Sequence, residues 1–302
     1  MDLSILIVSW NTRELLESCL ESIERSWPAG DLQAEVIVVD NGSSDNSAEL
    51  VQTRFPAARL IVNRENVGFA RANNQGLALS QGRYVLLLNS DTVVHAGALE
   101  TLHRFMEQRP QAGACGPRLL NADGSLQSSC YPVLTPGREL WRLAFLDRLW
   151  RRATYAQERW NTTVPRQVEV IKGACLLLRK AALDQVGLLD ERYFMYSEEM
   201  DLCYRLALAG WEMWWAPQAV VTHVGEASSR QMATAMYVQL YRSKVAFHRK
   251  FGGPAQAERF KRLLWLLYLP RLAFAAVAGQ RSPSMRQRAQ TYRQLLAELK
   301  GM

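Results

Sequence analysis

Short apolar runs alternate with helical patterns over the first hundred residues of this chain. Residues 4–9 and the run that ends at Asp40 are continuous apolar stretches, typical of strands buried on both faces of a parallel sheet. We expect a third, shorter strand over residues 59–63 and a fourth over residues 84–88. Strand and helix units in succession predict an α/β fold with a mostly parallel sheet and right-handed crossovers.

Helical spacing of apolar residues predicts a helix after each of the first three strands. The first follows Thr12, its expected N-cap, the second starts near Ser47, and the third covers residues 69–79. Gly68 permits a tight backbone turn before the third helix, and Gly82 follows its end.

The second half of the chain repeats these signals less regularly. We expect a strand and a polar hairpin over residues 110–131, strand character over 168–179, a helix from Glu198 to a glycine cap at Gly210, and a strand ending at His223. Residues 137–160 combine apolar and arginine residues. That segment is either a helix packed on the core or one that lies on a membrane.

Asp40 and Asp91 each follow a predicted parallel strand, at the sheet edge where ligands bind in open α/β folds. A carboxylate there can meet a divalent cation that carries a diphosphate. The alternatives are structural: Asp91 could cap the next helix, and Asp40 could close an Asx turn. The chain has neither a P-loop nor a GxGxxG pattern, which excludes the usual ATP and dinucleotide sites.

Composition and charge narrow the class of protein. The five cysteines are widely spread and form no CxxC pair, so we expect reduced thiols in a cytoplasmic protein without a signal peptide. The net charge is +7, but residues 242–302 hold 13 Lys or Arg and two Glu. The basic character therefore belongs to the C-terminal region, and it suggests an anionic partner.

Four motifs, IVSWNT, VVDNGSSDNS, NVGFARANNQG and LLLNSD, occur in an order that resembles glycosyltransferase family 2. The resemblance implies a GT-A fold, with a Rossmann-like nucleotide-sugar-binding half over residues 1–110 and an acceptor and catalytic half over 111–231. The family usually carries DxD where this chain has NSD, a variant shared by its rhamnosyltransferase-like members. Residues 232–302 would form a separate basic helical region.

The resemblance also implies roles for individual residues. Asp91 would hold the metal on the donor diphosphate, and Asp40 would accept a hydrogen bond from the base or ribose. The residues expected to contact substrate are Ser9, Asn11, Asp40, Asn41, Gly68, Arg71, Asn74, Asn89, Ser90, Gly173, Glu198 and Asp201.

The motif SEEMDLCYR resembles the acidic motif of the family, commonly EDxDLCxR. The match makes Glu199 the general base, although the family more often has Asp there, and places Glu198 and Asp201 beside it. The alternative is structural, because acidic side chains at a helix N-terminus are stabilising by themselves.

His223 lies where family members supply a second metal ligand, so the resemblance implies a Mn²⁺ or Mg²⁺ site shared with Asp91. A single histidine is otherwise most often a satisfied polar residue. The implied reaction is inverting transfer of a sugar from a nucleotide diphosphate sugar to a hydroxyl of a lipid-linked or cell-surface glycan, with dTDP-rhamnose favoured over a UDP-sugar. The rival functions are a sugar-phosphate nucleotidyltransferase and a non-catalytic scaffold.

Residues 259–278 have a basic start and an apolar middle that is too short to span a bilayer. We expect this segment to anchor the protein peripherally on the cytoplasmic face of the inner membrane, with Trp265 and Tyr268 near headgroups and Lys261 and Arg262 on anionic phosphates. The alternative is a packing helix for a homodimer or for the catalytic domain. No nucleic-acid motif accompanies the positive charge, so we expect no nucleic-acid partner.

Overall fold

The computed structural model describes residues 1–27, 32–149, 153–225 and 233–302. The chain forms two compact units. The first unit comprises Met1–Val133, Ala156–Glu191 and Glu198–Ser228, and the second comprises Leu134–Tyr155, Arg192–Ser197 and Ser229–Met302. Residues 134–155 and 192–197, which the sequence assigned to the catalytic domain, thus belong to the second unit. Trp150, Arg151 and Arg152 of the expected helical segment lie outside the described residues.

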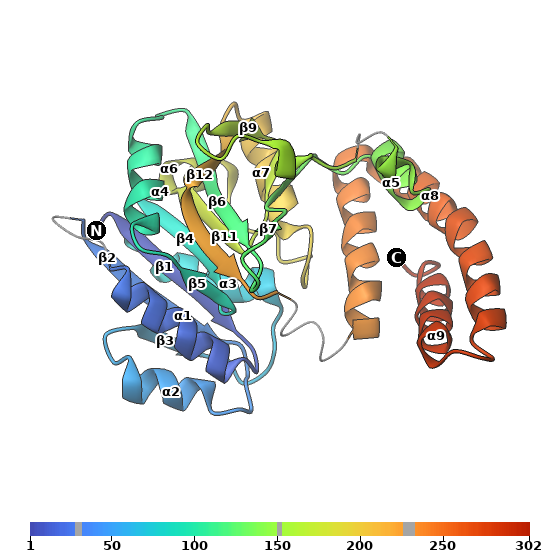
Figure 1. The fold of residues 1–302 in the computed structure, drawn as a ribbon, viewed down its shortest axis with the longest axis horizontal. Coiled ribbons are helices and arrows are strands. Elements are labelled where there is room, and N and C mark those ends of the chain that lie inside the picture. The colour runs from blue at the N-terminus through green and yellow to red at the C-terminus, as the bar shows by residue number, and fades with distance from the viewer. Residues whose placement is uncertain (28–31, 150–152, 226–232) are drawn as a thin grey trace. The chain divides into compact units, whose positions relative to one another are not determined.

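The first unit begins with regular strand and helix units (Figure 1). Its first elements are β1 (Leu3–Ser9), α1 (Arg13–Arg25), β2 (Ala34–Asp40), α2 (Ser47–Arg54), β3 (Arg59–Val62), α3 (Phe69–Leu79) and β4 (Tyr84–Asn89). These bounds confirm the predicted order of strands and helices. The four strands pair in parallel in the order β3-β2-β1-β4.

The remaining elements of the first unit complete a mixed sheet. They are β5 (Thr92–Val94), α4 (Ala98–Glu107), β6 (Ala112–Leu120), β7 (Leu126–Gln127), β8 (Cys130–Tyr131), η2 (Gln157–Arg159), β9 (Arg166–Val168), β10 (Val170–Ile171), β11 (Cys175–Arg179), α6 (Lys180–Val186), α7 (Glu198–Leu208) and β12 (Glu212–His223). The sheet order is β3-β2-β1-β4-β11-β6-β12-β5. The expected strand over residues 168–179 is in fact two strands and the end of a third, separated by short breaks.

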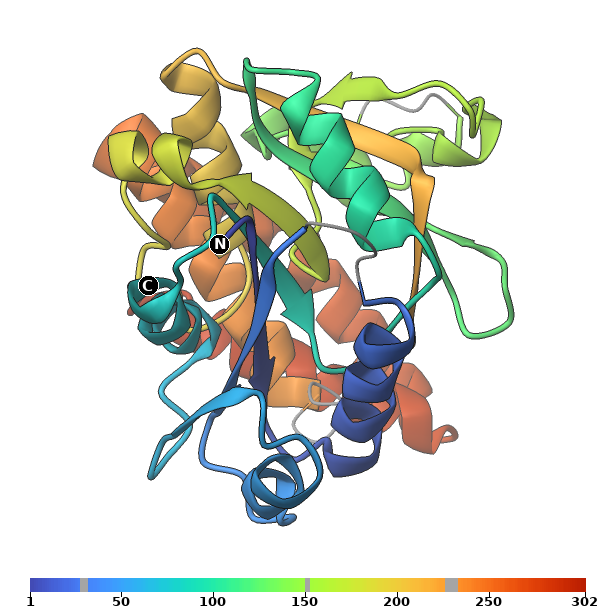
Figure 2. The ribbon, with the colours of Figure 1, turned by 90° about the vertical axis from the view of Figure 1, so that its left-hand side faces the viewer.

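Helices cover both faces of this sheet, which explains the continuous apolar strands (Figure 2). Ile5 and Ile7 of β1 share a buried cluster with Leu16 of α1. Leu6 points to the opposite face, where a Cβ added to Gly76 of α3 would lie 1.9 Å from its side chain. The glycine therefore lets α3 pack closely on the sheet.

Gly42, in the loop after β2, adopts a positive φ of 79°, and an added Cβ would lie 2.6 Å from the backbone carbon of Glu65. We expect Gly42→Ala to lower the free energy of unfolding by about 1–3 kcal/mol, measured by urea denaturation. Gly124 has a similar φ of 80° but open space around it. Gly124→Ala should therefore cost less, and an equal or larger loss there would contradict the steric argument.

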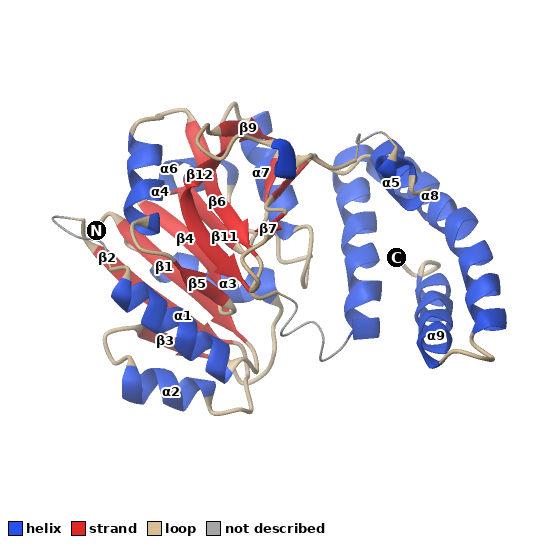
Figure 3. Ribbon diagram, viewed as in Figure 1, coloured by secondary structure: helices blue, strands red, loops and turns tan. Residues whose placement is uncertain are grey.

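The second unit is helical in its described residues (Figure 3). It contains α5 (Pro136–Leu143), η1 (Leu146–Arg148), α8 (Ala233–Ala278) and α9 (Pro283–Glu298), and α8 is kinked at Gly253. Among the described helices, none combines the length and the apolar character needed to cross a bilayer.

Two residues expected at a membrane surface lie inside this unit instead. Tyr268 is 2 % exposed in the core between α8 and α9, and its hydroxyl lies 2.5 Å from that of Tyr241. Lys261 is buried, with Nζ 2.7 Å from Glu258 Oε1 and 3.3 Å from the Met302 carbonyl. Helix packing, which the local sequence does not encode, turned both side chains inward, so these two assignments were wrong.

Candidate active site

Strand direction brings distant residues to one edge of the first unit's sheet. β11 lies between β4 and β6 and is antiparallel to both, and β12 pairs in parallel with β6, so β12 points the same way as β4. His223, Asn89, Asp40 and Ser9 are the last residues of β12, β4, β2 and β1. The carboxyl ends of these strands form the edge where ligands bind in such sheets.

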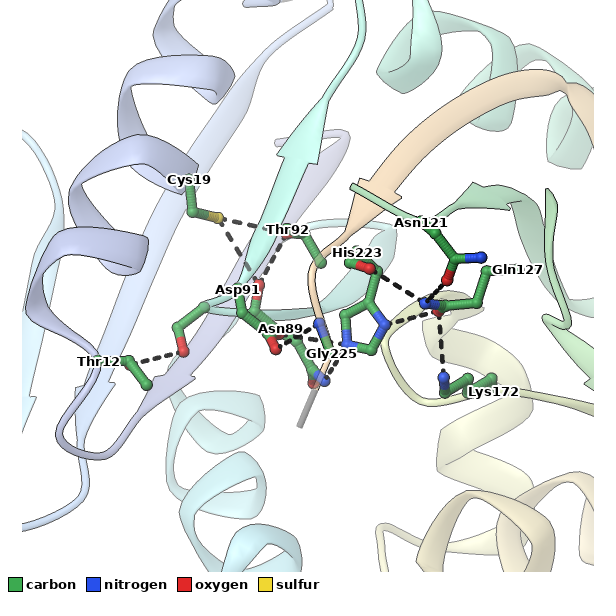
Figure 4. A network of polar contacts seen from close by, with 11 residues as sticks. Thr12, Cys19, Asn89, Asp91, Thr92, Asn121, Gln127, Lys172, His223 and Gly225 are labelled. Carbon is green, nitrogen blue, oxygen red and sulfur yellow. Dashed lines mark hydrogen bonds and ion pairs between the residues drawn. The ribbon is translucent and has the colours of Figure 1, made fainter. Parts of the chain in front are cut away.

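Asp91 and His223 lie in direct contact at this edge (Figure 4). Asp91 Oδ1 is 3.2 Å from His223 Nε2, and the backbone N–H of Gly225 donates to Asp91 Oδ2 at 3.1 Å. Only two residues separate β4 from β5, and Thr92 of β5 pairs with His223. That short connection places Asp91 beside the end of β12, as the metal-site prediction required.

The electrostatics of Asp91 suit a bound cation. Burial opposes its ionisation, but the hydrogen bond and the charge of His223 outweigh burial and lower the pKa of Asp91 below its ordinary value. The Oδ1 to Nε2 distance of 3.2 Å is close to the separation of roughly 3 Å between adjacent ligands of an octahedral ion with bonds of about 2.1 Å. No group of three or more His, Cys, Asp and Glu side chains gathers anywhere in the described ranges. A metal would therefore need ligands from its substrate as well.

Asn89 and Ser90 of the NSD motif face different neighbours. Asn89 Nδ2 lies 3.3 Å from His223 Nε2, and its Oδ1 is buried with no hydrogen-bond partner among the described residues. Ser90 Oγ is 2.9 Å from Thr12 Oγ1, which is also 2.9 Å from Ser9 Oγ. Thr12 holds the N-cap position of α1 as expected, but its hydroxyl bonds these two serines and not the helix N–H groups.

The two carboxylate oxygens of Asp40 have different surroundings. It is 2 % exposed, and its Oδ1 accepts the backbone N–H of Ser43, three residues on, at 3.0 Å. An Asx turn would use the N–H of Gly42, so Asp40 closes the loop after β2 with a bridge one residue longer than the expected turn. Its Oδ2 has no hydrogen-bond partner within the part of the chain that the structure describes. A buried carboxylate oxygen of this kind is available to a donor group on a ligand.

Asn11 and Asn41 shape the loops around Asp40. Asn11 has a positive φ of 51°, and its Oδ1 accepts the backbone N–H of Ser44 at 2.8 Å. Asn41 is buried, donates to Asn66 Oδ1 at 2.9 Å and accepts from the backbone of Val67 at 3.1 Å. Both side chains thus hold neighbouring loops together.

Gly68, Arg71 and Asn74 belong to the start of α3. Gly68 has φ 91° and ψ 161°, a conformation essentially limited to glycine, which confirms the predicted turn. Asn74 Nδ2 donates to the Leu189 carbonyl at 2.8 Å, and Asn74 Oδ1 accepts the Leu189 N–H at 3.1 Å. Arg71 is exposed, 4.0 Å from Glu191. Asn74 therefore fastens residues 189–191, a role that its sequence context did not indicate.

Glu199 sits in the first turn of α7 with one oxygen held and one free. The Tyr131 hydroxyl donates to Glu199 Oε1, whereas Oε2 is buried without a hydrogen-bond partner among the residues described. A Cβ added to Gly173 would lie 3.6 Å from the Glu199 Cβ, so the backbone at Gly173 passes next to this side chain. The arrangement leaves Oε2 able to accept a proton.

A short stretch of backbone connects Glu199 to the Asp91 cluster. The N–H of Asn89 donates to the Ala174 carbonyl at 3.0 Å, and the adjacent Gly173 borders Glu199. The break between β10 and β11 therefore runs between the two clusters. It brings the predicted base and the predicted metal ligands to one region of the first unit.

Asp201 is fully buried and serves the fold. Arg205 Nε donates to Asp201 Oδ1 at 2.6 Å. The remaining guanidinium nitrogens of Arg205 donate to the carbonyls of Val186, Gly187 and Leu188. The pair ties α7 to the segment after α6, and the prediction that Asp201 binds substrate has no geometric support.

Glu198 is 5 % exposed, and burial together with the charge of Glu199 raises its pKa well above 4.5. A folded state that holds a proton more tightly than the unfolded state loses stability as pH rises above 4.5. Glu198→Gln cannot ionise, so its Tm relative to wild type should increase between pH 5 and pH 8. A constant difference in calorimetric Tm would show that Glu198 is ionised in the folded protein.

The sequence did not predict three side-chain contacts at this edge of the sheet. Gln127 accepts from His223 Nδ1 at 2.7 Å, Lys172 Nζ lies 3.2 Å from Gln127 Oε1, and Tyr131 contacts Glu199. Gln127 and Tyr131 belong to the expected 110–131 segment, but a lone Gln or Tyr in a hairpin carries no local signal of its partner.

Comparison with known proteins identifies the family. The model of glycosyl transferase family 2 matches residues 4–186, more than half of the chain. The chain belongs to glycosyl transferase family 2. It is accordingly a glycosyltransferase, and the resemblance seen in its motifs is confirmed.

Two relatives of this family 2 chain are themselves sugar transferases by name. The N-acetylglucosaminyl-diphospho-decaprenol L-rhamnosyltransferase of Mycobacterium tuberculosis is 33% identical over 238 residues, which cover 73% of this chain and 75% of that protein. The low-salt glycan biosynthesis hexosyltransferase Agl10 of Haloferax volcanii is 29% identical over 210 residues, 68% of this chain and 61% of its own length.

Solved structures support the GT-A-like fold of this family 2 chain. The mannosyltransferase PcManGT from Pyrobaculum calidifontis, in complex with GDP-Man and Mn²⁺, has a TM-score of 0.55 at 17% identity and covers 98% of this chain and 85% of that one. GalNAc-T7 with UDP, GalNAc and Mn²⁺ has a TM-score of 0.56 at 16% identity, covering 74% of this chain and 44% of that one. These likenesses establish the fold class.

Proposed function

We propose that this glycosyltransferase transfers a sugar with inversion from a nucleotide diphosphate sugar to a hydroxyl of a lipid-linked glycan, assisted by a divalent cation. The observation that carries the proposal is the contact of Asp91 with His223, one short backbone segment away from the free oxygen of Glu199. This is the arrangement needed for a diphosphate leaving group and a proton acceptor at one site.

The residues present fit a divalent cation. Asp91 Oδ1 and His223 Nε2 would hold it, with the donor diphosphate and water supplying the other ligands. Mg²⁺ is a hard cation that prefers oxygen ligands, so the imidazole makes Mn²⁺ the better fit of the two. When bound, the cation would offset negative charge on the departing diphosphate. Both fold neighbours named above have Mn²⁺ bound in their structures, which supports this choice.

The chain's own residues account for the remaining steps. Asp40 Oδ2 would accept a hydrogen bond from the base or ribose of the donor. Glu199 Oε2 would take the proton of the acceptor hydroxyl while Tyr131 holds Oε1 in place. Bond formation at the anomeric carbon and loss of the nucleoside diphosphate then occur on opposite faces of the sugar, which inverts its configuration.

Rhamnose is the favoured sugar, donated as dTDP-rhamnose. The support is the relative from M. tuberculosis, whose name specifies rhamnosyl transfer to a lipid diphosphate-linked sugar. Screening nucleotide sugars for a rise in Tm with Mn²⁺, followed by release of the nucleoside diphosphate in the presence of acceptor, tests donor and reaction together. If a nucleotide sugar raised the Tm but no nucleoside diphosphate was released with any of a series of lipid-linked acceptors, that nucleotide sugar would not be the donor of a transfer to these acceptors.

We further propose that α8 attaches the protein peripherally to the cytoplasmic face of the inner membrane. Leu266, Phe274 and Val277 are 70%, 68% and 70% exposed on one face of this helix. Arg259 and Arg262 lie exposed on the same face, within two turns before Leu266. Exposed apolar residues next to exposed arginines suit an anionic bilayer surface.

Changing Leu266, Phe274 and Val277 together to Asp should abolish co-sedimentation with vesicles that contain anionic lipid. Leu208 on α7 is 68% exposed, and Leu208→Asp provides the matched control in the first unit. Unchanged binding of the triple variant would exclude this face as the anchor.

A further inference from the structure

Gln127, the last residue of β7, contacts His223 at both ends of its side-chain amide (Figure 4). Gln127 Oε1 lies 2.7 Å from His223 Nδ1 and 3.2 Å from Lys172 Nζ. Gln127 Nε2 donates to the His223 carbonyl at 3.1 Å and to Asn121 Oδ1 at 2.8 Å. These four contacts surround the amide within the described part of the chain.

Two of these groups determine which end of the amide is the oxygen. An ammonium group only donates hydrogen bonds, and a backbone carbonyl only accepts them. The reversed amide would place its NH₂ against Lys172 Nζ and its oxygen against the His223 carbonyl, which are both repulsive contacts. The oxygen must therefore face Lys172 and the imidazole.

The orientation of Gln127 in turn determines the protonation of His223 Nδ1. This nitrogen faces an acceptor at 2.7 Å, so it carries a hydrogen. The other ring nitrogen, Nε2, lies 3.2 Å from Asp91 Oδ1 and 3.3 Å from Asn89 Nδ2, and it is the nitrogen left to offer a lone pair to a cation. A hydrogen that Nε2 shares with Asp91 in the metal-free protein would leave when a cation binds. Metal-binding histidines characteristically donate their second ring N–H to a neighbouring acceptor of this kind.

We propose that Gln127 is a positioning residue that keeps a hydrogen on His223 Nδ1 and directs Nε2 toward Asp91 and any cation the two share. The proposal builds on the divalent site of the proposed function. Lys172 and Asn121 hold Gln127 by its two ends, so the amide cannot rotate to follow the ring. The hairpin before β8 thereby selects the nitrogen of His223 that faces the site.

The tautomer can be observed in the protein without metal. With ¹⁵N-labelled histidine, four ring systems are present, and His223→Asn identifies the His223 signals by their loss. Wild type should show a protonated Nδ1 above as well as below the titration of the ring. Gln127→Met removes the acceptor at similar volume and should shift the proton to Nε2. Gln127→Glu retains an acceptor and should restore the wild-type pattern.

The affinity for Mn²⁺ in the presence of dTDP gives a second readout, and the EPR signal of the free ion measures it. Gln127→Met should lower this affinity roughly 10- to 100-fold, and the affinity of Gln127→Glu should be close to that of wild type. Ser125→Ala is the control, because Ser125 is exposed and contacts Asn121 without touching Gln127. If Gln127→Met does not fold, Gln127→Asn withdraws the amide by one methylene and serves the same comparison.

A wild-type His223 that lacks a hydrogen on Nδ1, or a Gln127→Met variant whose neutral ring still carries one there, would overturn the proposal. If wild type bound no Mn²⁺, that result would instead contradict the proposed divalent site. In that case the tautomer of the metal-free protein still decides the role of Gln127.

Discussion

Glu199→Gln should reduce kcat about 10²- to 10⁴-fold, while affinity for the nucleotide sugar stays within a few-fold of wild type. The amide oxygen of glutamine can still accept the Tyr131 hydroxyl, so the side chain keeps its position. It cannot accept the proton of the acceptor hydroxyl, which is the function assigned to Oε2. Initial rates of nucleoside diphosphate release and calorimetric donor binding separate the two effects.

Glu49→Gln gives a matched control, because Glu49 is an exposed carboxylate on α2. It should leave both quantities unchanged. Near-normal turnover of Glu199→Gln would remove Glu199 as the base. Glu198 would then be the next carboxylate to test, since its Oε2 is also buried without a partner among the described residues.

The first half of the fold was predictable because its signals are local. Continuous apolar runs marked β1, β2 and β4, and the bounds of α3 match the predicted residues 69–79. Parallel strands place their carboxyl ends together, so Asp40 and Asp91 could be assigned to one edge before any coordinates were known. The residues that follow strands were the informative ones.

The second half was less predictable because its contacts depend on packing between distant segments. The 168–179 run breaks at residues 172–174, where the backbone passes between Asn89 and Glu199. Asn74 and Asp201 looked like ligand contacts, yet their partners are the Leu189 backbone and Arg205. The sequence position of a single Asn or Asp does not show whether its side chain binds a ligand or holds a neighbouring loop by hydrogen bonds.

Asp91→Ala should remove the increase in donor affinity that Mn²⁺ provides. In wild type, the affinity for the nucleotide sugar should be about 10- to 100-fold higher with Mn²⁺ than with EDTA. Mutations around metal sites typically change metal affinity or activity by a factor of this size. In Asp91→Ala the two affinities should converge, because His223 alone leaves the ion without its anionic protein ligand. Isothermal titration of both proteins under both conditions measures this directly.

Asp91→Asn refines the test by keeping the size of the side chain. Its amide can still accept the Gly225 N–H, so loop geometry at the end of β12 should persist. The charge is lost, and with it the attraction to His223 that lowers the pKa of Asp91 in the folded protein. If Asp91→Asn retained the full Mn²⁺-dependent increment, a neutral oxygen would suffice and the argument from charge would fail. If Asp91→Ala retained it too, the cation would have to bind elsewhere, and the contact between Asp91 and His223 would be an ordinary buried ion pair.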